Sequence, residues 1–364
     1  MADKQTLLAA GSVYQLLTAV HLRQNRLIPD ETDLLLTDHL PGRMGLAARL
    51  RETGLFRRVL LGDTRELNRR FAGGKEPAEE AFSNAGRHLR FALSDEPAAY
   101  DEVYFGSFDM IIRLLACLYA DRPCGFFWYE DGFSSYVIDY LRENRAAVNR
   151  HPATQILRDK LRGALLYEPR LAMRGDGVPN QPLPKISRED GALKETLNFL
   201  FQYRPPEETP EFLFLEQSFR ADGIKSNDLD LMRECRDAVG AGRFGVKPHP
   251  RNPENLPYQR GLTRRPASDA PWELFLLNER ADSLCLLTVC SNAALTGRIL
   301  FGLDIPTVML YPLFEGKILW QEDAVLRRYL RRFQLQFAGR EYFVPETHYE
   351  LRHILDYLGG HHAP

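Results

Sequence analysis

Three polar motifs in this sequence follow short apolar runs, and each could take part in acid–base or phosphate chemistry. The first is Glu130-Asp131-Gly132, which follows the run FFWY at residues 126–129. If this run is a strand, both carboxylates lie at its carboxyl end, where open α/β sheets bind their ligands. Adjacent acids repel each other, which can raise one pKa enough for a general base near neutral pH. A strand that ends in an acidic glycine turn is the plain structural alternative.

The second motif is KPHP at residues 247–250, where Lys247, Pro248 and His249 follow the apolar run FGV. Prolines fix the backbone on both sides of His249 and so preset the direction of its imidazole. Such a fixed group suits contact with a phosphate oxygen, to which it can offer a proton or a hydrogen bond. His151, which also precedes a proline, follows polar residues instead of an apolar run and is therefore a natural control.

The third motif is Ser291-Asn292, which follows the apolar run CLLTVC. The Ser291 hydroxyl can cap the next helix, or it can bind a nucleotide phosphate together with free backbone amides. A weaker element is Glu273 in the segment APWELF. An acid in the first turn of a helix is favourable by itself, but a carboxylate there could also accept hydrogen bonds from both ribose hydroxyls.

The elements that must position these motifs alternate between apolar runs and amphipathic stretches, which is typical of βαβ units. In the first half we expect strands at Thr6–Ala10, Asp33–Thr37, Arg58–Leu61, Glu102–Phe105 and Gly125–Tyr129. Helices are expected between them at Ser12–Gln24, Gly42–Thr53, Thr64–Phe71 and Phe108–Tyr119. In the second half the strand candidates are FLFLEQ, FGVKP, CLLTV and IPTVMLY, with helices near 228–238, at 272–281 and from 291.

A chain of 364 residues favours two domains. The Gly- and Pro-rich stretch at 173–185 is expected to cross between them, and PPEETPE at 205–211 is a second break. We therefore expect an α/β protein with two Rossmann-like domains at 1–185 and 206–343 that face a cleft, followed by a C-terminal helix at 344–364. A single sheet with a large insertion is the less favoured alternative.

Composition excludes several classes of protein. Hydrophobic residues at 44% and charged residues at 26% are ordinary globular values, and a net charge of -2 gives no bulk field for nucleic acid. Five scattered cysteines indicate a reducing compartment, and no run of about 20 apolar residues is present. We expect a cytoplasmic protein without a metal site, in which Asp228 and Asp230 start a helix.

Five arginines lie in the segment Val325–Arg340 at near-helical spacing. A solvated helix face is the plain interpretation, and contact with an anionic membrane surface or an anionic substrate is the functional one. Peripheral contact with the inner membrane face and a homodimer both stay open.

Taken in order, EDG, KPHP, PWE and CSN resemble the bacterial sialyltransferases of GT-B architecture, which share a D/E-D/E-G motif, an HP motif and a Ser/Thr motif. Among these, the chain is most similar to glycosyltransferase family 52, the lipooligosaccharide and capsule sialyltransferases. The segments GSVYQLLTAVHL and FLEQSFRADG are also similar to that family. The similarity spans most of the chain, and its specificity comes from the conjunction of short motifs.

This resemblance implies an inverting enzyme that transfers sialic acid from CMP-sialic acid to a glycan acceptor. Asp131 would be the base, His249 and Ser291 would bind the CMP phosphate, and Glu273 would hold the ribose. Lys247, Pro248 and Asn292 would complete the nucleotide site. The donor carries a single phosphate, so no metal or other cofactor is expected.

Two features depart from the family pattern. Asn292 replaces the second hydroxyl of the Ser/Thr motif, and Asp222 belongs to a second DG pair nearer to His249. Asp222 therefore remains an alternative base. The alternative functions are another GT-B enzyme that uses CMP-Kdo or a UDP-sugar, and a non-catalytic subunit that binds a nucleotide or a glycan.

Overall fold

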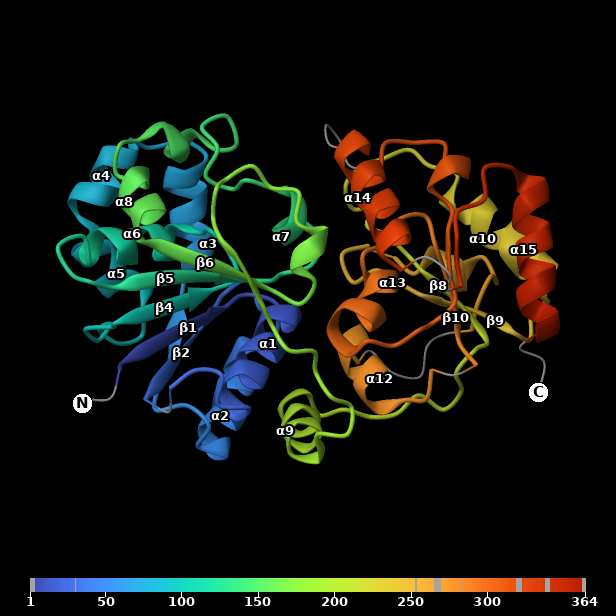
Figure 1. Cartoon of the computed structure of the whole chain (residues 1–364), viewed down its shortest axis with the longest axis horizontal. Coiled ribbons are helices and arrows are strands. Elements are labelled where there is room, and N and C mark those ends of the chain that lie inside the picture. The colour runs from blue at the N-terminus through green and yellow to red at the C-terminus, as the bar shows by residue number, and fades with distance from the viewer. Residues whose placement is uncertain are drawn as a thin grey trace. The chain divides into compact units, whose positions relative to one another are not determined.

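The computed structural model describes residues 4–29, 31–252, 254–264, 270–281, 283–318, 323–337 and 341–361. The chain divides into two units, Met1–Tyr203 and Arg204–Pro364, each built on its own parallel sheet (Figure 1).

The described part of the first unit contains a seven-stranded parallel sheet in the order β3-β2-β1-β4-β5-β6-β7. Its strands are β1 Thr6–Ala10, β2 Thr32–Thr37, β3 Val59–Gly62, β4 Glu102–Phe105, β5 Gly125–Tyr129, β6 Leu161–Leu166 and β7 Asn180–Pro182. Its α-helices are α1 Val13–Gln24, α2 Arg43–Thr53, α3 Thr64–Leu67, α4 Ala78–Ser83, α5 Ala85–Ala92, α6 Met110–Leu118, α7 Ser134–Val137, α8 Thr154–Lys160 and α9 Gly191–Phe201.

Helices cover both faces of this sheet, with α1, α2 and α9 on one side and α5, α6 and α8 on the other (Figure 1). A strand covered on both faces has no solvent side, so its sequence is a continuous apolar run instead of an alternating one. Every residue of β1, TLLAA, is buried accordingly. The strand order reverses between β1 and β4, which is the position where doubly wound sheets open a crevice.

The described part of the second unit contains a five-stranded parallel sheet in the order β12-β11-β10-β8-β9. Its strands are β8 Phe212–Leu215, β9 Phe244–Lys247, β10 Cys285–Thr288, β11 Thr307–Met309 and β12 Tyr342–Phe343. Its α-helices are α10 Asp228–Val239, α11 Leu256–Gln259, α12 Trp272–Asn278, α13 Ala293–Thr296, α14 Asp323–Gln336 and α15 His348–His361. Here the strand order reverses between β8 and β10.

The expected α/β class is confirmed, and β1, β4 and β5 have the predicted bounds. The stretch at 173–185 is different: it contributes the edge strand β7, and the chain passes to the second unit only after Tyr203. Proline is tolerated on an edge strand, because its missing N–H is not needed by a further neighbour. The helix expected at Thr64–Phe71 is also interrupted, since α3 continues into a π-helical turn at Asn68–Ala72.

Candidate functional site

Asp131 follows β5 at the carboxyl edge of the first sheet and is linked to the loop after β1. The Ser12 hydroxyl donates to Asp131 Oδ1 at 2.9 Å, and the Asp131 amide donates to Ser135 Oγ at 2.8 Å. Burial raises the pKa of Asp131, although hydrogen bonds from Gln15 and Ser12 oppose the shift. Asp131 is therefore a partly exposed carboxylate with neutral partners and increased basicity.

Glu130, the neighbouring acid, points into the core and is fully buried. Its carboxylate accepts hydrogen bonds from the Tyr14 hydroxyl at 2.5 Å, the Tyr136 hydroxyl and the Tyr167 amide at 2.8 Å. Burial raises the pKa of Glu130 to about 7, against the effect of these hydrogen bonds. The sequence predicted that repulsion between the adjacent acids raises one of their pKa values. Both pKa values are raised, but burial is the largest cause of each shift.

Two glycines allow the loops at this edge to approach. Gly132 has φ +74, a left-handed conformation that turns the chain directly after Asp131. Gly106 follows β4, and a Cβ there would lie 2.4 Å from the Gln15 side chain. Since Gly106 has no Cβ, Gln15 can cross this loop and donate to Ser107 Oγ at 2.8 Å.

His249 follows β9 at the carboxyl edge of the second sheet. Its amide donates to Glu216 Oε2 at 2.9 Å, and its Nδ1 accepts from the Arg251 amide at 3.2 Å. Burial lowers the pKa of His249, and the charge of Arg251 lowers it further against the opposing effect of Asp222. The imidazole is therefore neutral near pH 7. Because Nδ1 is an acceptor, the proton lies on Nε2, which becomes a directed hydrogen-bond donor.

The two residues that follow β8 along the chain bind the loops that follow the neighbouring strands β9 and β10. Glu216, which is buried, accepts from the His249 amide, and Gln217 Oε1 accepts from the Cys290 amide at 2.8 Å. Two consecutive side chains thus tie the loops after β9 and β10 to the strand that separates them. Sequence analysis assigned neither residue to the site, although both stand at the end of the apolar run FLFL.

Ser291 follows β10 at the same edge. Its amide donates to Thr288 Oγ1 at 3.1 Å, and its hydroxyl oxygen accepts from the Ala293 amide at 3.3 Å. The N-cap of α13 is Asn292, whose side chain makes no capping hydrogen bond, so the Ser291 hydroxyl is not the expected helix cap. Its proton can still be donated to a ligand. Within the described residues, the buried Oδ1 of Asn292 has no hydrogen-bond partner.

Lys247 contacts the segment before α12, and Glu273 lies in the first turn of this helix. Lys247 Nζ donates to the Ala270 carbonyl at 3.1 Å, which ties the end of β9 to the segment before this helix. Glu273 is half-buried in the first turn of α12, and the Trp272 indole donates to the Ala293 carbonyl at 2.7 Å. The latter bond connects α12 with the segment that follows Ser291.

Asp222 is held by its own neighbours. Its Oδ2 accepts from the Ser218 hydroxyl at 2.6 Å and forms an ion pair with Arg251 at 2.8 Å. To accept a proton, Asp222 would have to give up this ion pair, whereas the partners of Asp131 are neutral. The arrangement favours Asp131 over Asp222 as a proton acceptor.

Among the described residues no group of three His, Cys, Asp or Glu side chains is placed to hold a metal ion. Asp228 and Asp230 lie in the first turn of α10, as predicted for a helix start. No helix in the described ranges is long and apolar enough to cross a membrane.

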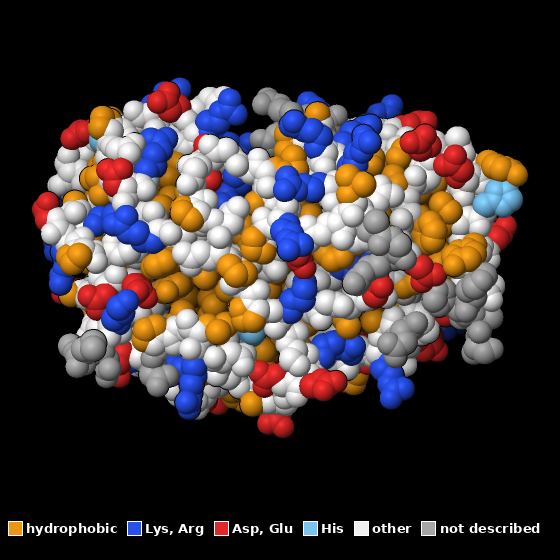
Figure 2. Space-filling model, in the orientation of Figure 1, with side chains coloured by type: hydrophobic (Ala, Val, Ile, Leu, Met, Phe, Trp, Pro, Cys, Tyr) orange, Lys and Arg blue, Asp and Glu red, His pale blue; other side chains and the backbone are white. Residues whose placement is uncertain are grey.

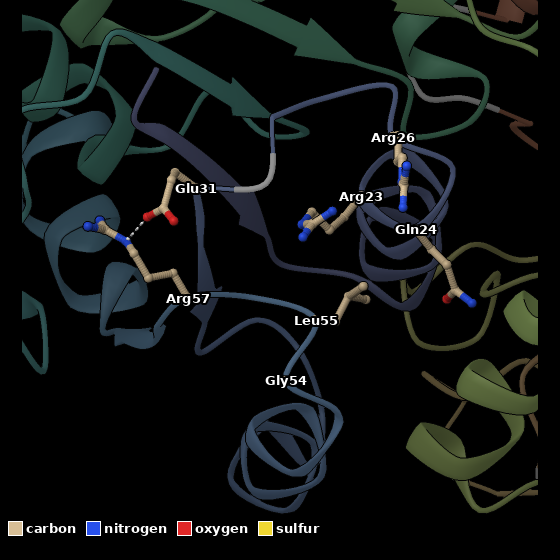
Figure 3. Close-up of a pocket in the computed structure, with 7 residues that line it drawn as sticks. All are labelled: Arg23, Gln24, Arg26, Glu31, Gly54, Leu55 and Arg57. Carbon is tan, nitrogen blue, oxygen red and sulfur yellow. Dashed lines mark ion pairs between the residues drawn. The ribbon is translucent and has the colours of Figure 1, made fainter. Parts of the chain in front are cut away.

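A pocket in the first unit lies elsewhere (Figure 3). It is lined by Arg23, Gln24, Arg26, Glu31, Gly54, Leu55 and Arg57. Glu31 and Arg57, which form an ion pair at 3.8 Å, precede β2 and β3. This pocket is therefore at the amino edge of the sheet, opposite the edge that carries Asp131, and we assign it no part in the chemistry.

No protein-family model and no curated protein sequence matches the chain. Among solved structures, Arabidopsis thaliana UGT89C1 is similar with a TM-score of 0.54 and 12% identity, over 100% of this chain and 91% of that chain. The same protein complexed with UDP-L-rhamnose gives a TM-score of 0.53 and 12% identity, over 100% and 92%. The S. aureus MnaA-UDP structure gives 0.48 and 10% identity, over 98% and 97%. Together with the two parallel sheets, the similarity to UGT89C1 confirms the GT-B fold.

Proposed function

We propose that this protein is an inverting glycosyltransferase that transfers sialic acid from CMP-sialic acid to a glycan acceptor without a metal ion. The GT-B fold and the similarity to a structure that holds UDP-L-rhamnose support a nucleotide-sugar donor. Fold alone does not define a reaction. The observation that carries the proposal is the hydrogen bond from the Arg251 amide to His249 Nδ1, which leaves the Nε2–H of this imidazole as a donor at the carboxyl edge of the second sheet.

The second unit would bind the donor. Negative charge builds on the phosphate as CMP departs, and donors fixed before the reaction stabilise that charge without reorganisation. His249 Nε2–H and the Ser291 hydroxyl are two such donors, on loops that Glu216 and Gln217 hold in place. A single phosphate carries less charge than a diphosphate, so two neutral donors can serve where a diphosphate needs a cation. Glu273 would accept hydrogen bonds from the ribose hydroxyls.

The first unit would activate the acceptor. Asp131 would take the proton of the acceptor hydroxyl as this oxygen attacks the anomeric carbon from the side opposite the phosphate. The bond from the anomeric carbon to the phosphate oxygen breaks with its electron pair on that oxygen, so the configuration inverts. The raised pKa of Asp131 suits this role, because a carboxylate of higher pKa is a stronger base.

The decisive experiment is incubation of the protein with CMP-sialic acid, CMP-Kdo and a panel of UDP-sugars, each with mixed glycan acceptors and with or without EDTA. We expect release of CMP from CMP-sialic acid, acceptor-dependent and unchanged by EDTA. A His249→Ala variant is the matched control for a contaminating activity. Release of UDP alone, or activity lost with EDTA and restored by Mn²⁺, would reject the donor assignment. Nucleotide binding without release from any donor would indicate the non-catalytic alternative.

A further inference from the structure

Helix α14 presents an unusual charge pattern. Arg327, Arg328, Arg331 and Arg332 are exposed, and none of the four has an ion-pair partner among the described residues. The opposite face of the helix is buried through Leu326, Tyr329, Leu330 and Phe333. Figure 2 shows Lys and Arg side chains at the surface over α14. Ion pairs with acids do occur for other arginines, such as Arg58 with Asp33 and Arg220 with Glu216, but the four arginines of α14 form none within the described residues.

The four arginines do not all face the same way. The Arg327 guanidinium lies over the ring of Tyr311, with Cζ 5.8 Å from the ring centre. Residues four apart share one side of a helix, so Arg331 lies on the side of Arg327, whereas Arg328 is turned by about 100°. Arg327 and Arg331 are thus the pair that lies toward Tyr311.

Tyr311 belongs to the same sheet edge as Ser291. It follows β11 by two residues, and the preceding Leu310 amide donates to the Thr288 carbonyl at 2.8 Å. Thr288 is the last residue of β10, and its Oγ1 accepts from the Ser291 amide. A continuous series of contacts therefore leads from Arg327 through Tyr311 and Thr288 to the loop that carries Ser291.

Electrostatics agree with this placement. Burial raises the pKa of Cys290 to about 12, opposed by its hydrogen bond with Gln217 and by the positive charge of Arg327. Burial also raises the pKa of Tyr311, against the charges of Arg327 and Arg331. Arg327 acts on both residues and Arg331 acts on Tyr311, so this side of α14 projects positive charge onto the loop next to Ser291.

We propose that Arg327 binds the carboxylate of the donor sugar and so selects donors that carry one. This inference rests on the proposed function. In CMP-sialic acid the carboxylate and the phosphate oxygen are attached to the same anomeric carbon, so a site that binds the phosphate has a second anion directly beside it. His249 and Ser291 provide neutral donors, and a guanidinium matches a carboxylate with two parallel hydrogen bonds. Arg331, one turn further along, adds to the positive field.

The test compares CMP with a non-transferable 3-fluoro analogue of CMP-sialic acid, because the two ligands differ by the sugar and its carboxylate. Calorimetry gives the Kd of each for wild type, Arg327→Ala and Arg328→Ala. We expect Arg327→Ala to raise the Kd of the analogue by about tenfold or more, because a charge-assisted pair is lost. The Kd of CMP should stay within about threefold of the wild-type value. Arg328→Ala, its matched control on the same helix, should change neither constant.

Three outcomes would overturn the inference. Equal weakening of both ligands by Arg327→Ala would place Arg327 on the nucleotide. No effect of Arg327→Ala, or the same effect from Arg328→Ala, would exclude a specific carboxylate contact. If wild type binds neither ligand, the proposed function itself fails. If wild type binds both and Arg327→Ala is silent, only the role of Arg327 fails.

Discussion

The hydroxyl of Ser12 donates to Asp131 Oδ1 at 2.9 Å and joins the loops that follow β1 and β5. The same oxygen accepts from the Gln15 amide at 3.1 Å, as the N-cap of α1. A serine hydroxyl has one proton, and the capping amide uses one lone pair. The direction of the Ser12–Asp131 bond is thereby fixed, and Asp131 receives a hydrogen bond that holds its carboxylate in one orientation.

This arrangement makes Asp131 the residue to test as the base. Asp131→Asn keeps the size of the side chain and still accepts from Ser12, so the fold and the CMP site should survive. We expect turnover to fall by about 10² to 10⁴, with the Kd of CMP within a few-fold. Steady-state kinetics and CMP binding provide the measurement. Asp222→Asn is the matched variant: a larger loss of turnover there than in Asp131→Asn would show that the second DG pair supplies the base.

A plot of kcat/KM against pH should fall on the acid side only. Burial raises the pKa of Asp131 above the ordinary aspartate value of 3.8, so its ionised form, and with it kcat/KM, should be lost as the pH falls through a midpoint above that value. Burial and Arg251 lower the pKa of His249 below 6.5, so it is already neutral at higher pH. We therefore expect kcat/KM to stay level as pH rises from about 7 to 8.5. A second limb with falling activity above pH 6 would mean that His249 must be protonated.

Much of the fold could be predicted because buried parallel strands leave a direct mark on the sequence. The runs TLLAA, EVYF and GFFWY became β1, β4 and β5 with the predicted bounds. A polar residue after such a run lies at the carboxyl edge of the sheet, and Asp131, His249 and Ser291 were found in this way. The strand β7, with the sequence NQP, has no apolar run and could not be recognised.

The partners of these residues could not be predicted, because they depend on strand order. Ser12 meets Asp131 only because β4 alone separates β1 from β5, and Glu216 meets the His249 amide only because β8 pairs with β9. Strand order is a long-range property that no local spacing encodes. The same reason explains why mutual repulsion of Glu130 and Asp131 was expected: the sequence shows that they are adjacent, but not that Glu130 turns to Tyr14 and Tyr136.

Asp33 offers a test of stability that is independent of function. Its fully buried carboxylate in β2 accepts from Arg57 Nη2 at 2.8 Å, Arg58 Nη2 at 2.7 Å and the Tyr100 hydroxyl at 2.6 Å. Asp33→Asn removes the anion of Arg58 and leaves Arg57 only its longer ion pair with Glu31 at 3.8 Å. Because both arginines are about one-third exposed, we expect a loss of about 2 to 3 kcal/mol in the free energy of unfolding, measured with urea.

The pH dependence of this contribution has a definite sign. Burial would raise the pKa of Asp33, but hydrogen bonds from Arg57, Arg58 and Tyr100 outweigh it and lower the pKa. The carboxylate therefore stabilises the fold above its unfolded pKa near 4, and the contribution is lost as pH falls through the lower folded pKa. Wild type and Asp33→Asn should converge in stability under acid. A constant difference down to pH 2 would contradict the ionic origin of the effect.

The last prediction separates chemistry at His249 from a structural role. The fold holds this residue through its backbone, since the amide donates to Glu216 and prolines flank it on both sides, so loss of the ring should leave the loop in place. We expect His249→Ala to keep its melting temperature within a few degrees and to lose turnover by about 10² or more, because a fixed donor to the departing phosphate is removed. His249→Gln, which retains an N–H donor on a more flexible side chain, should recover part of that loss.

His151→Ala is the control: His151 pairs with Glu79 at 2.7 Å and packs against Phe82, so its removal should cost about 1 kcal/mol of stability and leave turnover unchanged. If His249→Ala is active but unstable, or if both alanine variants lose turnover equally, the HP motif is a structural element and the donor site must be sought elsewhere.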